Sequence, residues 1–244
     1  MSSPSAPRAW EQVLARLEEK LISGELAPGQ RLPGERILAA ELGVGRSSVR
    51  EALRVMEALG LLTAHTGSGP NAGAMIVSRP VGGMSMLMRM QVAAQNFPVR
   101  DVVQTRLVLE TEVVQTLAGT RPVPDLSHAE ELLIAMDSPE LSAHEFLVLD
   151  SRFHIALADA AGNLVIASMM AALRESIESY VLAGAPLATW PETCSRLRHE
   201  HHGLVAAVRA GDVEAARQRI GDHIRGYYAE SLSNPLNGAP PPVV

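Results

Sequence analysis

The spacing of hydrophobic residues divides the chain into two parts of different character. In the first part, three segments carry apolar residues three and four positions apart, which is typical of amphipathic helices, and two short segments alternate as strands do. Beyond residue 83 every periodic segment has helical spacing. We expect those helices over residues 84–95, 99–119, 124–136, 142–161, 164–182, 189–209 and 213–232. The pattern predicts a mainly α fold, in which a winged helix-turn-helix domain precedes an antiparallel all-α bundle of about seven helices.

The expected domain boundaries follow from where the pattern changes. Residues 8–79 form the predicted winged helix domain, 80–83 a linker and 84–232 the helical domain. The last segment, 233–244, is so rich in Pro and Gly that we expect it to be disordered.

One stretch of the first domain, residues 41–62, predicts a helix-turn-helix. Gly43 ends one helix, and Ser47 or Ser48 can cap the next, because a hydroxyl accepts from free N–H groups of a first turn. Arg46 and Arg50 lie four positions apart and therefore project from one side of that turn. The inward stripe is expected at Val49, Ala52, Leu53, Met56 and Leu59. This arrangement is typical of a helix that reads the DNA major groove.

Composition and charge add little to this picture. The formal net charge of the 244 residues is −6, but residues 1–79 hold nine basic and eight acidic side chains. The remainder holds 12 basic and 19 acidic side chains. Overall charge therefore neither proves nor excludes DNA binding, and the local placement of arginines decides.

The same composition indicates a cytoplasmic protein without a membrane span. No apolar run approaches the roughly 18 residues of a spanning helix, and the N-terminus lacks a secretory signal pattern. Cys194 is the only cysteine, which excludes an internal disulfide and fits a reducing compartment.

Four side chains of the helical domain predict a divalent metal site. Asp150 and His154 lie one helical turn apart, on one face. His201 lies ten residues before Gly211 and His223 lies twelve residues after it, so antiparallel helices joined there bring both to about the same height. A carboxylate and three imidazoles suit zinc or nickel best, and manganese or iron can also bind such ligands.

The N-terminal domain resembles the GntR family of bacterial transcription regulators. The resemblance is carried by GELAPGQRLPGERILAAELGVGRSSVREALRVMEALGLL, with His65 and Gly69 following in the wing. It implies that the chain binds double-stranded DNA through its recognition helix and wing. The DNA-contacting residues that it implies are Arg36, Arg46, Ser47, Ser48, Arg50, His65 and Gly67.

The helical domain resembles the FCD domain of the FadR subgroup. The motifs are QTRLVLE, DSRFHIAL, AGN at 161–163, EHHGLVAAVRAGDVEAAR and His223. The resemblance implies that a metal is bound by Asp150, His154, His201 and His223. It also selects His201 over its neighbour His202. It further implies a small organic acid on the metal. Arg106 would meet that carboxylate and Asn163 is a further ligand-binding candidate, although its place at a helix junction favours a turn role.

Together these patterns indicate a metabolite-responsive transcription regulator, expected to be a repressor and not an enzyme. A homodimer would bind a palindromic operator, since a two-fold protein matches two half-sites. The alternative is a metal-dependent hydrolase or lyase at the same Asp/His site, with Glu200 as a base. A purely structural helical dimer is a third reading, which leaves both sites without a role.

Overall fold

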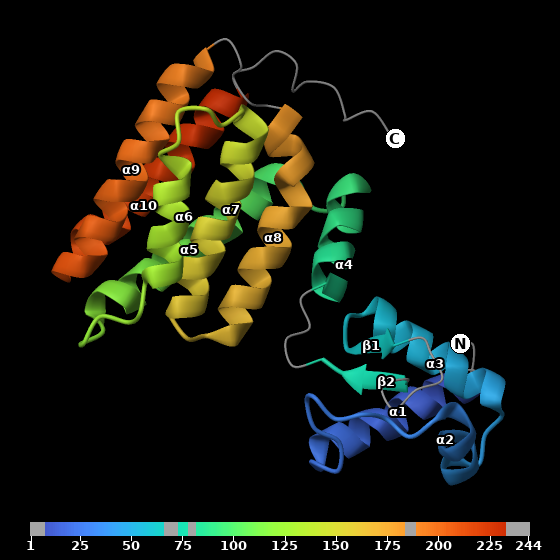
Figure 1. Cartoon of the computed structure of the whole chain (residues 1–244). Coiled ribbons are helices and arrows are strands. Elements are labelled where there is room, and N and C mark those ends of the chain that lie inside the picture. Colours follow the sequence, from blue (N-terminus) through green and yellow to red (C-terminus); the bar gives the residue numbers. More distant parts are fainter. Residues whose placement is uncertain (1–7, 66–72, 78–81, 184–188, 233–244) are drawn as a thin grey trace, which may run out of the picture. The chain divides into compact units, whose positions relative to one another are not determined.

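The computed structural model describes residues 8–65, 73–77, 82–183 and 189–232 (Figure 1). The chain divides into two compact units at Met84–Ser85. The prediction of a mainly helical fold with a two-stranded wing and a bundle of seven helices is confirmed. Gly67 and the tail 233–244 lie outside the described residues.

The first unit contains three helices and two strands. They are α1 (Ala9–Ile22), α2 (Glu35–Leu42), α3 (Arg46–Ala58), β1 (Leu62–His65) and β2 (Gly73–Ile76). Helix α3 packs against both α1 and α2. Its buried stripe is Val49, Ala52 and Met56, whereas Leu59 is 48% exposed because it follows the last helical turn. The stripe was therefore predicted one residue too long.

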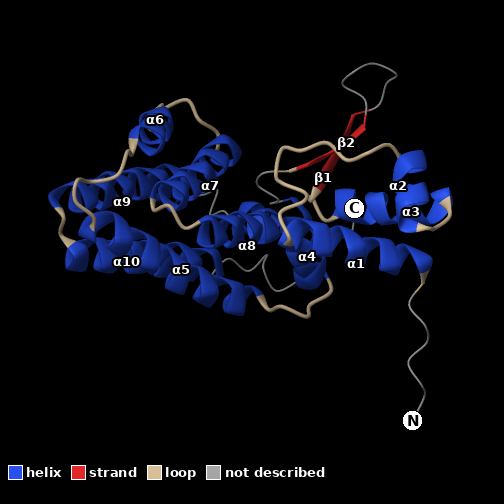
Figure 2. Cartoon of the chain, turned by 90° about the horizontal axis from the view of Figure 1, so that it is seen from below, coloured by secondary structure: helices blue, strands red, loops and turns tan. Residues whose placement is uncertain are grey.

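Strands β1 and β2 form the antiparallel wing (Figure 2). Leu62 pairs with Ile76, and His65 pairs with Gly73. The connector between α1 and α2 lies along the other edge of β2, because the Leu32 N–H donates to the Ala74 carbonyl and the Ile76 N–H donates to the Gln30 carbonyl. These bonds satisfy the edge that a two-stranded ribbon leaves open.

Helix α3 begins earlier than its serines suggested. Gly43 ends α2 in the left-handed conformation, with φ of 65°, which glycine adopts without a steric penalty. The Gly45 carbonyl then accepts from the N–H groups of Ser48 and Val49, so Gly45 is the N-cap. Ser47 and Ser48 lie inside the first turn and cap nothing, which corrects the sequence prediction.

The second unit is built from helices alone within its described residues. They are α4 (Gly82–Ala93), α5 (Val99–Gly119), α6 (Ser127–Met136), α7 (Ala143–Ala160), α8 (Leu164–Ala183), α9 (Trp190–Ala210) and α10 (Val213–Leu232). Helix α4 begins at Gly82 and so includes the last two residues of the expected linker. Each helix from α5 onward lies within a few residues of its predicted range, because every break carries Gly, Pro or Asn.

Helix α5 lies at the centre of this unit, in contact with α7, α8, α9 and α10. Most of its buried positions are apolar, such as Val113, Val114 and Leu117. Two charged residues, Arg106 and Glu110, are buried on the same helix. Charged side chains are rarely buried without partners, so this pair marks the interior as a site rather than a plain core.

None of the helices in the described residues is long and apolar enough to cross a membrane.

Candidate functional site

Three helices bring the four predicted metal ligands together. Asp150 and His154 come from α7, His201 from α9 and His223 from α10. One ligand atom from each lies within 4.8 Å of the others. The three imidazoles are buried and Asp150 is partly buried. The expected convergence is confirmed, and the cluster is a candidate metal site of the composition that bundles use for divalent ions.

The turn between α9 and α10 sets the height of two of these residues. Gly211 adopts φ of 75° and ends α9, so α10 returns antiparallel and packs against α9. The rings of His201 and His223 consequently lie 4.7 Å apart. His202 lies on the exposed side of α9, where its Nε2 is 3.0 Å from Asp137, and it takes no part in the cluster.

Carboxylates outside the cluster orient two of the imidazoles. His154 Nδ1 lies 2.7 Å from Glu110 Oε2, and His223 Nδ1 lies 2.8 Å from Glu200 Oε2. Such a contact places the proton on Nδ1 and leaves Nε2 as the electron-pair donor. His154 Nε2 faces Asp150 Oδ1 at 3.7 Å. A carboxylate behind each ligating histidine is the usual outer shell of a metal site.

The buried nitrogens of the cluster fit a bound cation. Within the described residues, His154 Nε2 and both ring nitrogens of His201 are buried without a properly oriented hydrogen bond. His201 Nε2 lies 3.0 Å from Asp150 Oδ1, so the two are close but misaligned. Buried polar atoms without partners are costly, and a metal ion would satisfy His154 Nε2 and one of the two His201 nitrogens.

Burial also keeps His154 and His201 in the protonation state that a metal requires. Burial, and next the charge of Arg174, lower the pKa of His154 to about 3 despite the neighbouring Glu110. Burial likewise lowers the pKa of His201. Neutral imidazole is the ligating form, so these histidines need not lose a proton before binding a metal at neutral pH.

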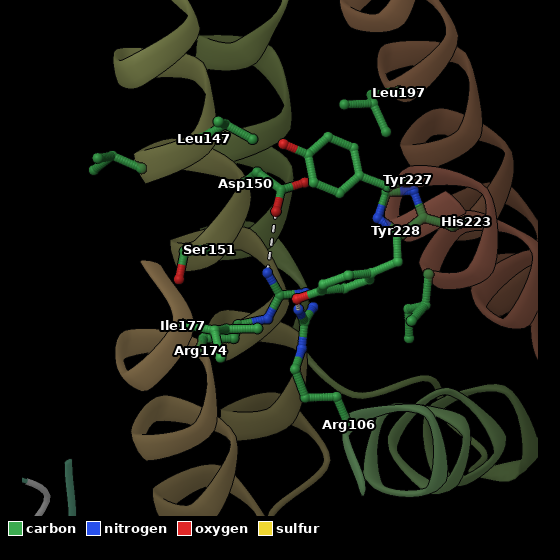
Figure 3. A pocket seen from close by; sticks show the side chains of 12 residues that line it. Arg106, Leu147, Asp150, Ser151, Arg174, Ile177, Leu197, His223, Tyr227 and Tyr228 are labelled. Carbon is green, nitrogen blue, oxygen red and sulfur yellow. Dashed lines mark hydrogen bonds and ion pairs between the residues drawn. The ribbon is translucent and has the colours of Figure 1, made fainter. Parts of the chain in front are cut away.

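A pocket opens beside the cluster (Figure 3). Figure 3 shows Asp150 and His223 at the pocket together with the guanidinium groups of Arg106 and Arg174. The other lining side chains are aliphatic, aromatic or hydroxyl-bearing. They are Leu147, Val148, Ser151, Ile177, Leu197, Ile224, Tyr227 and Tyr228. Two cationic groups beside a candidate metal site make the pocket suitable for a small anion.

Both guanidinium groups are already engaged by acidic side chains. Arg174 Nη1 donates to Asp150 Oδ2 at 3.0 Å, and its Nη2 donates to the two oxygens of Glu110 at 3.1 and 3.0 Å. Arg106 Nε donates to Glu110 at 3.0 Å, and its Nη1 donates to the Tyr228 hydroxyl at 2.8 Å. Arg106 therefore lines the pocket and also forms an ion pair with Glu110, four residues on in the same helix.

Two pocket residues escaped the sequence analysis. Arg174 is the first charged residue of α8, after ten uncharged ones, and it follows Leu173 on a helix that buries Met170 and Ile177. An arginine that follows ten uncharged residues on a helix with a buried face is a signal of a buried charge. Tyr228 carried no signal, because a tyrosine near the end of an amphipathic helix is common in ordinary cores.

Asn163 is placed away from the pocket lining. Its Oδ1 accepts from the N–H groups of Val165 and Ile166, both at 3.1 Å. It therefore caps the start of α8, as asparagine often does.

The residues implied to contact DNA lie at the start of α3 and on α2. Arg46, Ser47 and Arg50 are exposed, Arg36 is exposed on α2, and Ser48 is half-buried. Within the described residues no ion pair engages Arg46 or Arg50. The backbone of His65 ends β1. Arg46 and Arg50 are thus presented to solvent near the start of α3, the second helix of the helix-turn-helix.

Comparison with known proteins identifies the family. Residues 101–226 match the FCD domain, and residues 9–70 match the bacterial regulatory proteins of the gntR family. The chain belongs to the GntR family and carries a C-terminal FCD domain of the FadR type. It is accordingly a DNA-binding transcription regulator.

Named relatives agree with this assignment over most of their length. The chain is 29% identical to the HTH-type transcriptional regulator LutR of Bacillus subtilis over 222 residues, covering 86% of this chain and 98% of that protein. It is 28% identical to the Glc operon transcriptional activator of Escherichia coli, covering 88% and 85%. The structure of Streptococcus agalactiae GntR is similar with a TM-score of 0.66 and 25% identity, covering 90% of this chain and 99% of that one.

The enzymatic alternative gains no support from the site. The relatives are transcription regulators rather than enzymes. Glu200, the base of that alternative, accepts from Arg196 at 2.6 Å and lies 2.8 Å from His223. A carboxylate engaged on both sides is a support for an imidazole rather than a free base.

The buried ion pairs of Arg174 should contribute to the free energy of unfolding. Replacement by Met removes the cation that compensates two carboxylates, and breaking a buried pair in this way costs about 3–5 kcal/mol. We expect that loss in urea unfolding of the metal-free protein, followed by Trp190 fluorescence in a Trp10→Phe background. Arg217→Met, at an exposed ion pair with Glu214, should cost less than about 1 kcal/mol. Equal losses in the two variants would contradict the prediction.

Proposed function

We propose that this regulator senses a small carboxylic acid, which binds beside a divalent metal in the helical unit and thereby changes operator binding. The metal ligands are Asp150, His154, His201 and His223. Zinc is the best candidate for this donor set, with nickel, manganese and iron as alternatives. When bound, the metal would supply a Lewis-acidic contact for an oxygen of the acid.

The observation that carries this proposal is the joint presence of an Asp/His cluster and two guanidinium groups at one pocket. Arg106 is the proposed anion-binding residue because its planar group can form paired bonds with a carboxylate. The apolar lining by Leu147, Ile177 and Ile224 favours a compact acid over a highly hydrated ion.

The proposed DNA-bound state is a homodimer on a palindromic operator in the cytoplasm. The candidate DNA contacts are Arg36, Arg46, Ser47, Ser48, Arg50, His65 and Gly67. Because residues 1–79 are nearly neutral in sum, one copy alone would hold DNA weakly, and two copies would combine their half-site affinities. We expect repression, with the acid shifting the dimer between two arrangements that differ in DNA affinity.

A hydroxy acid is the first probe to try. One relative, 26% identical over 89% of this chain, is named as a putative L-lactate dehydrogenase operon regulatory protein of Escherichia coli. L-lactate is small, carries one carboxylate and has an adjacent hydroxyl that can also donate an oxygen to a metal.

The recognition-helix assignment predicts a loss of DNA affinity in Arg50→Ala. A bidentate base contact is worth about 1–3 kcal/mol, so each half-site should lose roughly fivefold or more. The measurement is fluorescence anisotropy on a DNA fragment that the wild type selects from a random-sequence pool. Arg54→Ala, which removes an equal charge one turn along α3, is the control and should keep most of the affinity. Wild-type binding by Arg50→Ala at moderate salt would refute the assignment.

The metal assignment predicts different behaviour of two adjacent histidines. His201→Ala should purify with far less than one equivalent of metal, because one ligand of the cluster is lost. His202→Ala should retain the wild-type metal content, since His202 faces Asp137 at the surface. Elemental analysis by mass spectrometry checks both, and DNA binding at saturating protein shows that each variant is folded. Equal metal content in the two variants would disprove the ligand set.

The effector assignment predicts that Arg106→Met loses its response to acid. Hydrogen bonds to a charged group contribute about 1.5–3 kcal/mol, so the L-lactate concentration that changes DNA anisotropy should rise at least tenfold. Arg100→Met, at an exposed position of the same helix, should respond as the wild type does. An unchanged response in Arg106→Met would exclude Arg106 as the anion-binding residue. An absent response in the wild type would exclude lactate and call for other carboxylic acids.

A further inference from the structure

Glu110 lies between the candidate metal cluster and the two arginines of the pocket. Its side chain extends from the central helix α5 and only 2% of the residue is exposed. One oxygen lies 2.7 Å from His154 Nδ1, on the metal side. Toward the pocket, Arg106 and Arg174 both donate to the same carboxylate. One carboxylate therefore has partners in the candidate metal cluster and in the candidate anion site.

Proton donors surround the Glu110 carboxylate. Arg106 and Arg174 donate to its oxygens, and His154 Nδ1 lies 2.7 Å from Oε2. An ionised carboxylate has only acceptor sites. It can therefore accept the Nδ1 proton of His154 and guanidinium protons at the same time.

On the metal side, this contact determines how His154 is presented. Acceptance from Nδ1 leaves Nε2 unprotonated and aimed at Asp150, where the structure leaves it buried without a hydrogen bond. Without the carboxylate the ring could rotate or take the other tautomer. Outer-shell partners of this kind typically change metal affinity about 10–100-fold when they are removed.

On the pocket side, Glu110 occupies the donors that an incoming acid needs. Arg106 turns Nε and Nη2 to Glu110, at 3.0 and 2.8 Å, and Arg174 turns Nη2 to both of its oxygens. A carboxylate that enters the pocket must share or displace these bonds. Glu110 is thus an internal competitor for the same guanidinium groups.

We propose that Glu110 is a positioning residue with two opposed effects: it strengthens metal binding by orienting His154, and it weakens acid binding by holding Arg106 and Arg174. This inference rests on the proposed metal and acid functions of the pocket. It assigns to Glu110 an effect on two ligands without contact to either.

The test on the metal side compares zinc affinities of full-length variants by competition with a chromophoric chelator. Glutamine has one acceptor oxygen where glutamate has two, so Glu110→Gln cannot serve His154 and both arginines. We expect zinc binding about 10–100-fold weaker in Glu110→Gln. Glu112→Gln, at an exposed position of the same helix, should bind zinc as the wild type does.

The test on the pocket side uses the metal-free protein and malonate, measured by isothermal titration calorimetry. In Glu110→Gln the internal competitor is weakened, so malonate should bind more tightly. We expect the affinity to rise by a factor of about five or more, the usual lower bound for the coupling between two binding sites. Opposite changes in zinc and malonate affinity cannot arise from a loosened fold, which would weaken both. Wild-type affinity for both ligands, or weakening of both, would overturn the proposal.

Glu110→Asp keeps the test decisive if Glu110→Gln folds poorly. It retains the negative charge that compensates the two guanidinium groups, but it is one methylene shorter and does not reach His154 as well. We expect weaker zinc binding with malonate affinity close to that of the wild type, and circular dichroism checks the fold. Wild-type zinc affinity in this variant would overturn the metal-side effect alone. Absence of zinc binding in the wild type would instead refute the proposed function, and this inference with it.

Discussion

The buried carboxylate of Glu110 on the central helix requires cationic partners, and these partners link several helices of the unit. Glu110 is enclosed by four packed helices, and an uncompensated charge there would cost several kcal/mol. Arg106 one turn earlier and Arg174 from α8 supply the compensation. The network crosses the bundle interior, so helices far apart in the sequence are joined by charge as well as by apolar packing.

The same network explains why the Asp/His cluster is open to a ligand. Glu110, Glu200 and Arg174 hold the outer atoms of His154, His223 and Asp150, while His154 Nε2 and both nitrogens of His201 have no partner of good geometry within the described residues. Protein interiors seldom keep buried polar atoms in this state without a reason. A cluster whose supports are satisfied and whose centre is not is preorganised for a cation.

The two units place different demands on charge. The DNA-binding unit needs exposed, unpaired arginines, and Arg46 and Arg50 meet that need on the first turn of α3. The helical unit instead buries Arg106 and Arg174 and pairs both with acidic side chains, in an interior where electrostatic interactions are stronger than in water. This division accounts for a regulator whose overall charge is negative.

Local sequence patterns were enough to predict the helices and part of the candidate metal site. Helical spacing and Gly or Pro breaks predicted the seven helices, since these signals act over one or two turns. The four-residue step from Asp150 to His154 is likewise a property of a single helix. The turn at Gly211 also predicted that His201 and His223 lie at the same height. In two antiparallel helices, residues about equally far from the connecting turn lie side by side.

Tertiary structure decided what depends on contacts between distant segments. His201 faces inward with Leu197 and Leu204 because α9 packs that face on its neighbours, whereas His202 lies against Asp137 at the surface. Arg174 reaches Glu110 across 64 positions of sequence, and Tyr228 reaches Arg106 across 122. Residue types and periods thus determined the helices and named the residues of the candidate metal site, whereas only packing could show which charges the interior brings together, because burial and pairing are properties of the assembled bundle.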